Sequence, residues 1–356
     1  MSKAAELANL IGNINAGGGG VNRNLIINGA MNVAQRSTSV ADLGDTNKTA
    51  AYLTLDRMYM NTGNTTGRMT MSQDSSAPEG FANSLKLDCT TADTSIASNE
   101  AVFLQTNFEG QNLQVLKKGT SSAVPVTVSF YVKGNASATY VCELYDYDNT
   151  RQISQTFNVT TDWTRVELTF VGDTSGTLDD DNGLSFAVNI WLHAGANFNP
   201  TSGGTLSTSW TSVTSASRAV GISSILDSTD RTFFITGWQM EVGQNSTEFE
   251  HEPFDTTFRK CQRYYETKND TADSSYVLIG YQSDGSNFRQ AWEFQVTKRA
   301  DPALSLATGA SWESASGYSA PTEYSGATHV EYYNTENFYC KQSTNNAPNL
   351  VADSEL

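Results

Sequence analysis

The feature that most constrains the fold is an alternation of apolar and polar side chains that recurs from about residue 21 to residue 255. A period of two places every second side chain on the same face of a β-strand. The clearest predicted strands are 124–134, 139–147, 163–172, 184–192 and 231–243. In the first of them, one face carries Val126, Val128, Phe130 and Val132. Strands of this length divided by turns predict an all-β protein with a two-sheet sandwich like a jelly roll.

The segments between these strands have the composition of solvated loops. Residues 172–183 and 193–209 are rich in Gly, Ser, Thr, Asn and Asp. Such residues favour turns and carry little apolar surface to bury. We therefore expect both segments to lie outside the core.

Length and charge limit the function classes. The chain has 356 residues, and a single core rarely grows beyond about 250–300 residues, so more than one folded unit is expected. Its formal net charge of −16 repels phosphate backbones and anionic lipid surfaces, which argues against nucleic acid as a partner. No apolar run approaches the roughly 18 residues that span a bilayer, and no export signal is visible.

The N-terminal residues 2–15 predict a short amphipathic helix followed by a hinge. One stripe of this helix carries Leu7, Leu10, Ile11 and Ile14. A helix this short is marginal in water, so the stripe must rest on something else. The glycine run at 16–20 separates it from the rest of the chain. Docking on a partner protein, bundling with copies of itself, and folding back on its own domain are the three possibilities.

The segment at 255–270 is expected to be a linking helix. Asp255 is a candidate N-cap, and one helical stripe carries Phe258, Cys261, Tyr264 and Tyr265. The predicted layout is 1–20 anchoring helix and hinge, 21–254 jelly-roll sandwich, 255–270 linking helix, and 271–356 C-terminal β domain.

An Asn-Gly pair at Asn28 and Gly29 stands at the start of the β region. Two interpretations are open. The pair can form a two-residue hairpin turn, or it can mark a bulge in one long first strand, where Gly29 allows close backbone approach.

The chain lacks the sequence patterns of common active sites. Its three histidines, His193, His251 and His329, are scattered, and no nucleophile elbow or phosphate-binding loop is visible. Pairs of carboxylates remain as the best argument for an enzyme, because glycosidases use two of them. The acidic candidates are Asp179–Asp181, Asp146 with Asp148, and Glu248 with Glu250. All are flanked by polar residues, so we interpret them as solvated loops and expect no catalytic residue.

No cofactor and no protein-metal motif are expected. The stretch at 179–183 resembles a calcium loop, yet Ile190 stands where a bidentate Glu is required. A structural Ca²⁺ elsewhere is left open, with no ligands named. The cysteines, Cys89, Cys142, Cys261 and Cys340, are too far apart for a metal or redox motif and are expected to be buried free thiols.

The C-terminal region offers candidate binding residues. Trp312, Tyr318 and Tyr324 lie in loops among Ser, Gly, Asn and Thr. Aromatic faces beside small polar groups suit recognition of a sugar or protein surface. Packing in the core or at an interface between copies is the alternative.

Several segments together resemble a known family. They are "RNLIINGAMNVAQRSTS" (23–39), "LTLDRMYM" (53–60), "TSWTSVTSASRAVGISSILDSTDRTFFITGWQMEVG" (208–243), "FEHEPFDTTFRKCQRYYE" (249–266) and "VTKRADPALSL" (296–306). In this order they are similar to segments of tailed-bacteriophage fibre and related virion proteins. The resemblance implies a jelly-roll domain, a linking helix, a distal β domain and a homotrimer.

That resemblance also implies how such a protein works. The chain would be a non-enzymatic virion protein, assembled in the host cytoplasm, that attaches to other phage tail or capsid proteins through its N-terminus. Its C-terminal domain would contact a glycan or protein of the host surface. No long shaft is visible, so we expect a short tail fibre or spike. The alternatives are a decoration or adaptor protein without receptor binding, and a polysaccharide-degrading enzyme.

Overall fold

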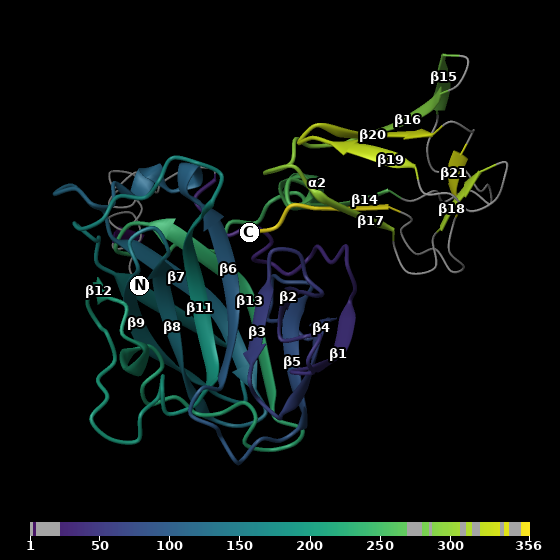
Figure 1. The fold of residues 1–356 in the computed structure, drawn as a ribbon. Coiled ribbons are helices and arrows are strands. Elements are labelled where there is room, and N and C mark those ends of the chain that lie inside the picture. The colour runs from purple at the N-terminus through teal and green to yellow at the C-terminus, as the bar shows by residue number, and fades with distance from the viewer. Residues whose placement is uncertain are drawn as a thin grey trace. The chain divides into compact units, whose positions relative to one another are not determined.

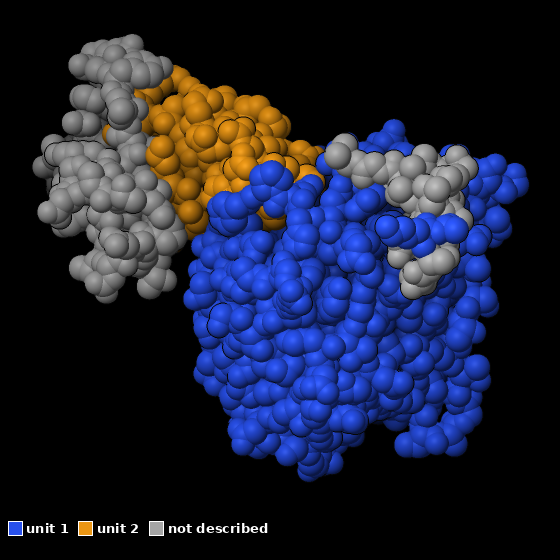
Figure 2. Space-filling model, turned by 180° about the vertical axis from the view of Figure 1, so that it is seen from behind, with its two compact units in different colours: residues 1–254, 356 blue, residues 255–355 orange. Residues whose placement is uncertain are grey.

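The computed structural model describes residues 3–4, 22–268, 280–284, 287–306, 311–314, 321–334, 338–341 and 350–356. The chain divides into two compact units, residues 1–254 with Leu356 and residues 255–355, coloured blue and orange in Figure 2. Nearly all of the regular structure is β, as the alternation predicted. Among the described residues, no helix combines the length and apolar character that a bilayer crossing requires.

The first unit is a sandwich of two antiparallel sheets (Figure 1). The six-stranded sheet contains, in spatial order, β1 (Ser39–Leu43), β4 (Arg68–Asp74), β5 (Ser84–Thr91), β13 (Thr232–Val242), β7 (Val126–Gly134) and β10 (Thr164–Phe170). The seven-stranded sheet contains β12 (Thr211–Ser212), β9 (Arg151–Val159), β8 (Ala138–Asp146), β11 (Leu184–Ala194), β6 (Ala101–Glu109), β3 (Tyr59–Gly63) and β2 (Ala50–Tyr52). Short 3₁₀ turns lie at η1 (Gly110–Asn112), η2 (Gln114–Leu116) and η3 (Ser215–Ser217). The chain crosses repeatedly between the sheets, which gives a jelly-roll-like sandwich.

The core lies between the two sheets and is built by the predicted alternation. All five strands predicted most clearly from the sequence are present, as β7, β8, β10, β11 and β13. The predicted inner face of β7 is buried, with Val128, Phe130 and Val132 fully so. From the opposite sheet, Leu104 and Ile190 belong to the same core cluster. Burying a side chain of this kind stabilises the fold by about 1.5–3 kcal/mol.

The Asn-Gly pair forms neither a hairpin nor a strand bulge. Asn28 adopts φ of 63° in a buried turn, and the first strand begins only at Ser39. The Asn28 side chain donates to the carbonyls of Val33 and Asp56, and its Oδ1 accepts from the backbone of residues 32 and 33. Both predictions were wrong because the side chain of Asn28, rather than a strand ladder, satisfies the backbone around it.

Gly29 does allow close backbone approach, but the neighbour belongs to the same chain. The Trp238 amide donates to the Gly29 carbonyl at 2.9 Å, and a Cβ on Gly29 would lie 2.0 Å from the Trp238 carbonyl oxygen. β13 pairs with β5 only through Thr232–Ile235. Beyond that point, the segment around Asn24 and Gly29 supplies the missing hydrogen bonds to β13.

The second unit is β-structure around a short helix. α2 spans Phe254–Gln262, and its chain continues through a turn into β14 (Tyr265–Lys268). β14 pairs with β22 (Leu350–Asp353), which pairs with β17 (Ala303–Leu306). Further strands are β15 (Gly280–Asp284), β16 (Asn287–Glu293), β20 (His329–Asn334) and β19 (Thr322–Ser325) in one sheet, and β18 (Ser311–Ser314) with β21 (Phe338–Lys341).

The linking helix is shorter than the predicted 255–270. The Tyr264 amide donates to the Cys261 carbonyl in a turn, and Tyr265 then pairs with Asp353 in β14. Tyr264 and Tyr265, whose spacing suggested a helical stripe, therefore lie in a turn and in a strand. The cysteines described with their side chains, Cys89, Cys142 and Cys261, are buried and free, as predicted.

Two segments of the family resemblance meet in this second unit. The buried Lys298 pairs with Glu266 and donates to the Gln262 carbonyl. Burial lowers the pKa of Lys298, although Glu266 opposes this effect. The Arg299 amide donates to the Arg263 carbonyl at 3.0 Å. The "CQRYYE" and "TKRADP" segments are thus structural partners.

Replacing Gly29 by Ala should destabilise the first unit, because the new Cβ would overlap the Trp238 carbonyl oxygen. We expect a loss of about 1–3 kcal/mol in unfolding free energy, measured by urea denaturation. Gly63→Ala is the control, since its nearest neighbour, at 3.2 Å, is the movable side chain of Asn61. Equal losses for the two variants would contradict this explanation.

Asp93 should contribute stability that depends on pH. Burial raises its pKa, but hydrogen bonds from Thr66 and Thr65 outweigh burial and hold the pKa at about 2. Because the folded pKa lies below the unfolded value, the contribution, about 2 kcal/mol, is present above about pH 4 and is lost as the pH falls towards 2. Asp93→Asn should therefore unfold more easily than wild type at pH 6 and by a shrinking margin below pH 4. The exposed Asp162→Asn should show no such trend.

Candidate functional site

The outer face of the seven-stranded sheet carries an aligned row of polar and aromatic residues. In the antiparallel registers, one residue from each of six adjacent strands falls into line. The row runs Ser154, Glu143, Asn189, Gln105, Tyr59 and Tyr52. Their strand neighbours, such as Leu144 and Ile190, point into the core. The period of two therefore presents these polar groups on the opposite face from the core.

Glu143 is the centre of a buried hydrogen-bond network on this face. Arg218 donates from Nε to Oε1 and from Nη2 to Oε2 of Glu143, both at 2.8 Å. The Glu143 Oε2 also accepts from Asn189 Nδ2 and Trp191 Nε1, each at 2.8 Å. Glu143 is fully buried, whereas the Arg218 side chain is 15% exposed. The bidentate geometry makes this a strong ion pair that fixes the guanidinium in one plane.

Aromatic rings cover this network and extend across the sheet. The Arg218 guanidinium lies 4.7 Å from the Tyr145 ring centre, and the Tyr145 and Tyr147 rings are 4.6 Å apart. The Tyr147 hydroxyl accepts from Gln105, whose register neighbour is Tyr59. The rings of Tyr59 and Tyr52 are 5.3 Å apart. We call this set the aromatic strip: Arg218, Tyr145, Tyr147, Tyr59 and Tyr52.

The strip keeps its protonation state over the ordinary pH range. Burial raises the pKa of Tyr59, Tyr145 and Tyr147 above the usual value for a phenol. Burial lowers the pKa of Arg218, but the Glu143 carboxylate outweighs this effect and raises it. The phenols therefore remain hydrogen-bond donors, and the guanidinium remains charged.

Four buried oxygens on the same face have no hydrogen-bond partner among the described residues. We call them the orphan oxygens: Asn107 Oδ1, Asn189 Oδ1, Gln152 Oε1 and Ser154 Oγ. The amide nitrogens of Asn189 and Gln152 donate to Glu143 and to the Ser207 hydroxyl, which leaves the oxygens facing elsewhere. A buried polar atom without a partner costs about 1–3 kcal/mol, so four on one face indicate that water or a ligand completes them.

His193 forms a second polar cluster that resembles a hydrolase triad. Its Nδ1 lies 2.6 Å from Ser224 Oγ, and its Nε2 lies 2.8 Å from Glu100 Oε2. The sequence search missed this arrangement because the three residues are far apart in the chain. Ser224 Oγ accepts from the Leu226 amide, and the Ile225 amide donates to the Leu192 carbonyl. Both hydrogen bonds fix the segment at residues 224–226 in place. We therefore assign the His193 cluster a structural role.

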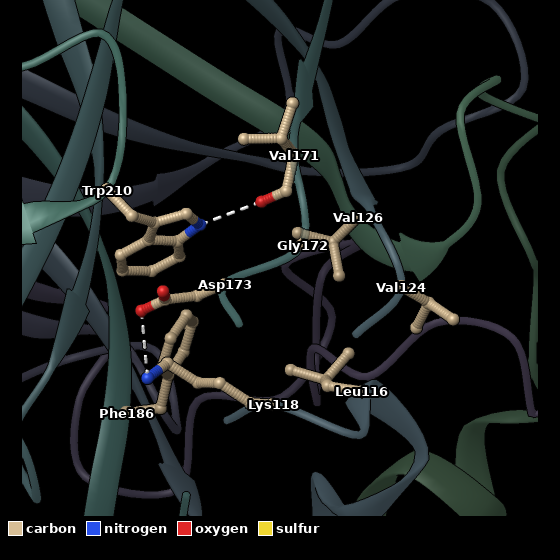
Figure 3. A pocket seen from close by; sticks show the side chains of 9 residues that line it. All are labelled: Leu116, Lys118, Val124, Val126, Val171, Gly172, Asp173, Phe186 and Trp210. Carbon is tan, nitrogen blue, oxygen red and sulfur yellow. Dashed lines mark hydrogen bonds and ion pairs between the residues drawn. The ribbon is translucent and has the colours of Figure 1, made fainter. Parts of the chain in front are cut away.

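A third cluster lies beside a small hollow at one end of the sandwich (Figure 3). Lys118 pairs with Asp146 and, at 3.1 Å, with Asp173, and it lies 5.4 Å from the Trp210 ring centre. Arg151 pairs with Asp173 from the other side. The hollow encloses only about 10 Å³, room for about one water molecule, so it holds no sugar or cofactor.

Some of the acidic residues that were expected to face solvent instead bond to other groups of the protein. Asp146 is fully buried on Lys118, so its interpretation as a solvated loop residue was wrong. Glu250 accepts from the backbone amides of Asn22 and Asn24 at 2.7 and 2.8 Å. Residues 179–181 are exposed, as expected. The described residues contain no group of three or more His, Cys, Asp or Glu side chains arranged to hold a metal ion.

The predicted binding residues fall in two classes. Tyr324 lies in β19 and is 64% exposed. The backbone of Trp312 lies in β18, while its side chain and the whole of Tyr318 lie outside the described part of the chain. The anchoring residues Leu7, Leu10, Ile11 and Ile14 also lie outside it. Their roles stay predictions.

The outer face was not predicted from the sequence. Glu143 and Asn189 each stand between apolar neighbours within a predicted strand, and this was the available signal. Residues 193–209 were also misjudged, because Phe198 and Leu206 from this loop join the cluster that packs on Trp191. That cluster covers one end of the outer face and leaves the aromatic strip beside it.

Comparisons with known proteins give structural likenesses only. No family model and no curated protein matches the chain. A structure described as "CBM4 structure and function" shares 11% identity over 61% of this chain and 99% of its own, with a TM-score of 0.33. A xylan-binding domain from CBM 22 shares 12% identity over 58% and 96%, with a TM-score of 0.31. A family 11 carbohydrate-binding module from Clostridium thermocellum, in complex with a mixed-linked tetrasaccharide, shares 10% over 55% and 91%, with a TM-score of 0.28.

Replacing Lys118 by Met should strongly destabilise the sandwich, because Asp146 and Asp173 would lose a buried counter-charge. Breaking such a pair costs about 3–5 kcal/mol, measurable by urea denaturation. Lys117→Met is the matched control, since Lys117 is exposed and adjacent in sequence. A loss below about 1 kcal/mol for Lys118→Met would show that the cluster does not support the fold.

Proposed function

We propose that this chain is a non-catalytic glycan-binding protein of a bacteriophage virion, a homotrimeric short tail fibre or spike, and that the aromatic strip is its sugar-binding surface. The composition of the aromatic strip is the main support for this proposal. It combines partly exposed rings, of which Tyr147 is 40% exposed, with phenol donors and a guanidinium edge. Aromatic faces pack on the apolar faces of sugars, while fixed polar groups hydrogen-bond to hydroxyls.

Preorganisation favours recognition over catalysis. The Glu143 network holds Arg218 and Trp191, and Gln105 holds Tyr147. Rings held in this way contribute contact area with little loss of conformational entropy on binding. The Glu143 carboxylate accepts from Arg218, Asn189 and Trp191, so it is engaged within the protein, whereas a glycosidase needs two available carboxylates.

The virion role follows from the resemblance of the five sequence segments. In this proposal the N-terminal residues Leu7, Leu10, Ile11 and Ile14 attach the chain to tail or capsid proteins of the particle. Several strips on one trimer would bind a repetitive host surface together. Avidity of this kind multiplies a weak affinity by about 10²–10⁴ where geometry allows. Tyr324 in the C-terminal unit remains a second candidate contact.

The test is adsorption. Purified protein should bind host cells, compete with phage adsorption and release no oligosaccharide. The double variant Tyr145→Ala with Tyr147→Ala should lose at least about tenfold in binding, because it removes the most exposed ring of the strip, Tyr147, and the neighbouring ring of Tyr145. Its fold should be checked by thermal denaturation, since Tyr147 also bonds Gln105.

Tyr324→Ala is the matched comparison, because it removes an even more exposed tyrosine from the other unit. If the strip is the principal contact, this variant should bind more tightly than the double variant does. Loss of binding in Tyr324→Ala but not in the double variant would move the site to the C-terminal unit. Wild-type protein that binds no host cells would favour the decoration or adaptor role, and released oligosaccharide would favour the enzyme.

A further inference from the structure

The charge on the aromatic strip is already neutralised within the protein. Arg218 gives Nε and Nη2 to Glu143, and its guanidinium lies between the rings of Tyr145 and Trp191, at 4.7 and 4.9 Å. An anionic ligand at the remaining Nη donors would meet a guanidinium whose charge Glu143 already balances, and it could form a full ion pair with Arg218 only by displacing the buried Glu143. Breaking a buried pair costs several kcal/mol, which is more than an exposed ion pair returns.

At the other end of the strip, the two cations found among the described residues are largely buried. Arg36 and Arg57 lie 5.6 and 5.7 Å from the Tyr52 ring centre. Arg57 is 1% exposed and donates to the Asn107 carbonyl. The Arg36 side chain is 9% exposed and lies 3.8 Å from Asp56. Both cations are therefore buried near an acidic neighbour.

The orphan oxygens select for a hydrogen-bond donor. Asn107, Asn189 and Gln152 each present an amide oxygen, which only accepts, and Ser154 presents a hydroxyl. Ionised carboxylates, sulfates and phosphodiesters carry no proton to give. Sugar hydroxyls do, and because the orphan oxygens are buried, we expect the hydroxyls to reach them through a bridging water, which is nearly as favourable as direct contact. The net charge of −16 adds long-range repulsion of polyanions.

The strip is also long. From Tyr145 in β8 to Tyr52 in β2 it crosses five adjacent strands, and four interstrand spacings amount to about 19 Å. This length exceeds a single sugar ring and suits a chain of several sugars laid across the strands.

From these observations we infer that the aromatic strip binds an uncharged oligosaccharide segment and rejects uronic acids, sialic acids and sulfated or phosphorylated sugars. This inference rests on the proposed function and adds the ligand class. Selectivity comes from the Glu143–Arg218 pair and the orphan oxygens, while the tyrosine rings provide contact area for any glycan.

The first test uses envelope polysaccharide purified from the host, before and after chemical reduction of its carboxyl groups to alcohols. Binding to full-length protein is measured by isothermal titration calorimetry at low and high salt. We expect the neutral or reduced polymer to bind with salt-independent affinity, and a natively acidic polymer to bind at least about tenfold more weakly at low salt. Binding that disappears on reduction, or that weakens steeply with salt, would overturn the inference.

The second test is Glu143→Gln, which keeps the shape but leaves the Arg218 charge without its counter-ion. This variant should gain salt-dependent binding to polygalacturonate, an acidic polymer that wild type should not bind. A folded Glu143→Gln variant that behaves as wild type would overturn the role of the pair. Should it fail to fold, the wild-type comparison of native and reduced polymers decides alone.

The two proposals fail in different ways. If an acidic glycan binds and Tyr145→Ala with Tyr147→Ala abolishes that binding, the sugar-binding strip stands and the neutral ligand class is wrong. If no polysaccharide of either charge binds in a manner that depends on these tyrosines, the proposed function itself is wrong.

Discussion

The burial of two apolar sheet faces against each other is the constraint on which the first unit depends. Successive side chains of a β-strand point to opposite faces of the sheet. When one side chain is buried in the core, its two neighbours in the strand therefore lie on the outer face. In β11, burying Val188 and Ile190 forces Asn189 outwards, and the same rule in β8 forces Glu143 outwards. The outer-face network is thus a geometric consequence of the core, and a one-residue slip of either strand would destroy both.

The segments that carry the family resemblance share a structural task. Asn24 and Gly29 complete the hydrogen bonds of β13 where β5 no longer pairs with it, and Asn28 closes the turn between them and Asp56. In the second unit, Lys298 joins the end of α2 to β14 through Glu266. Such contacts depend on particular side chains, because a buried amide or ammonium tolerates few substitutes. Two of the stretches, 53–60 and 208–243, also contribute Tyr59 and Arg218 to the aromatic strip.

The strands could be predicted because their alternation is local. Each element was read from its own residues, and the positions of β7, β8, β10, β11 and β13 followed. The site could not be predicted in this way, since it depends on register between strands that are distant in sequence. Glu143 meets Asn189 across one ladder, and Asn189 meets Gln105 across the next. Nothing within β8 alone indicates that its glutamate will receive four hydrogen bonds.

Long-range pairing also explains the two local errors. Tyr265 fits a helical stripe by spacing, but its backbone pairs with Asp353 near the other end of the chain. The polar loop after β11 was assigned to solvent, yet Phe198 lies 5.3 Å from the Trp191 ring centre. In both cases a partner elsewhere in the chain outweighs local propensity, which spans only about 1 kcal/mol per residue.

Three cations of the described structure share one arrangement, and in the proposed function this arrangement links stability to recognition. Lys118, Arg218 and Lys298 are each largely buried beside a carboxylate, where neither member can be exchanged for an external ion without a large desolvation cost. These buried cations cannot pair with an external anion. The excess of acidic residues gives the protein its net negative charge. In the proposed function, affinity comes from the tyrosine rings and from hydrogen bonds to sugar hydroxyls. The chemistry that holds the sandwich together therefore also restricts what its outer face can bind.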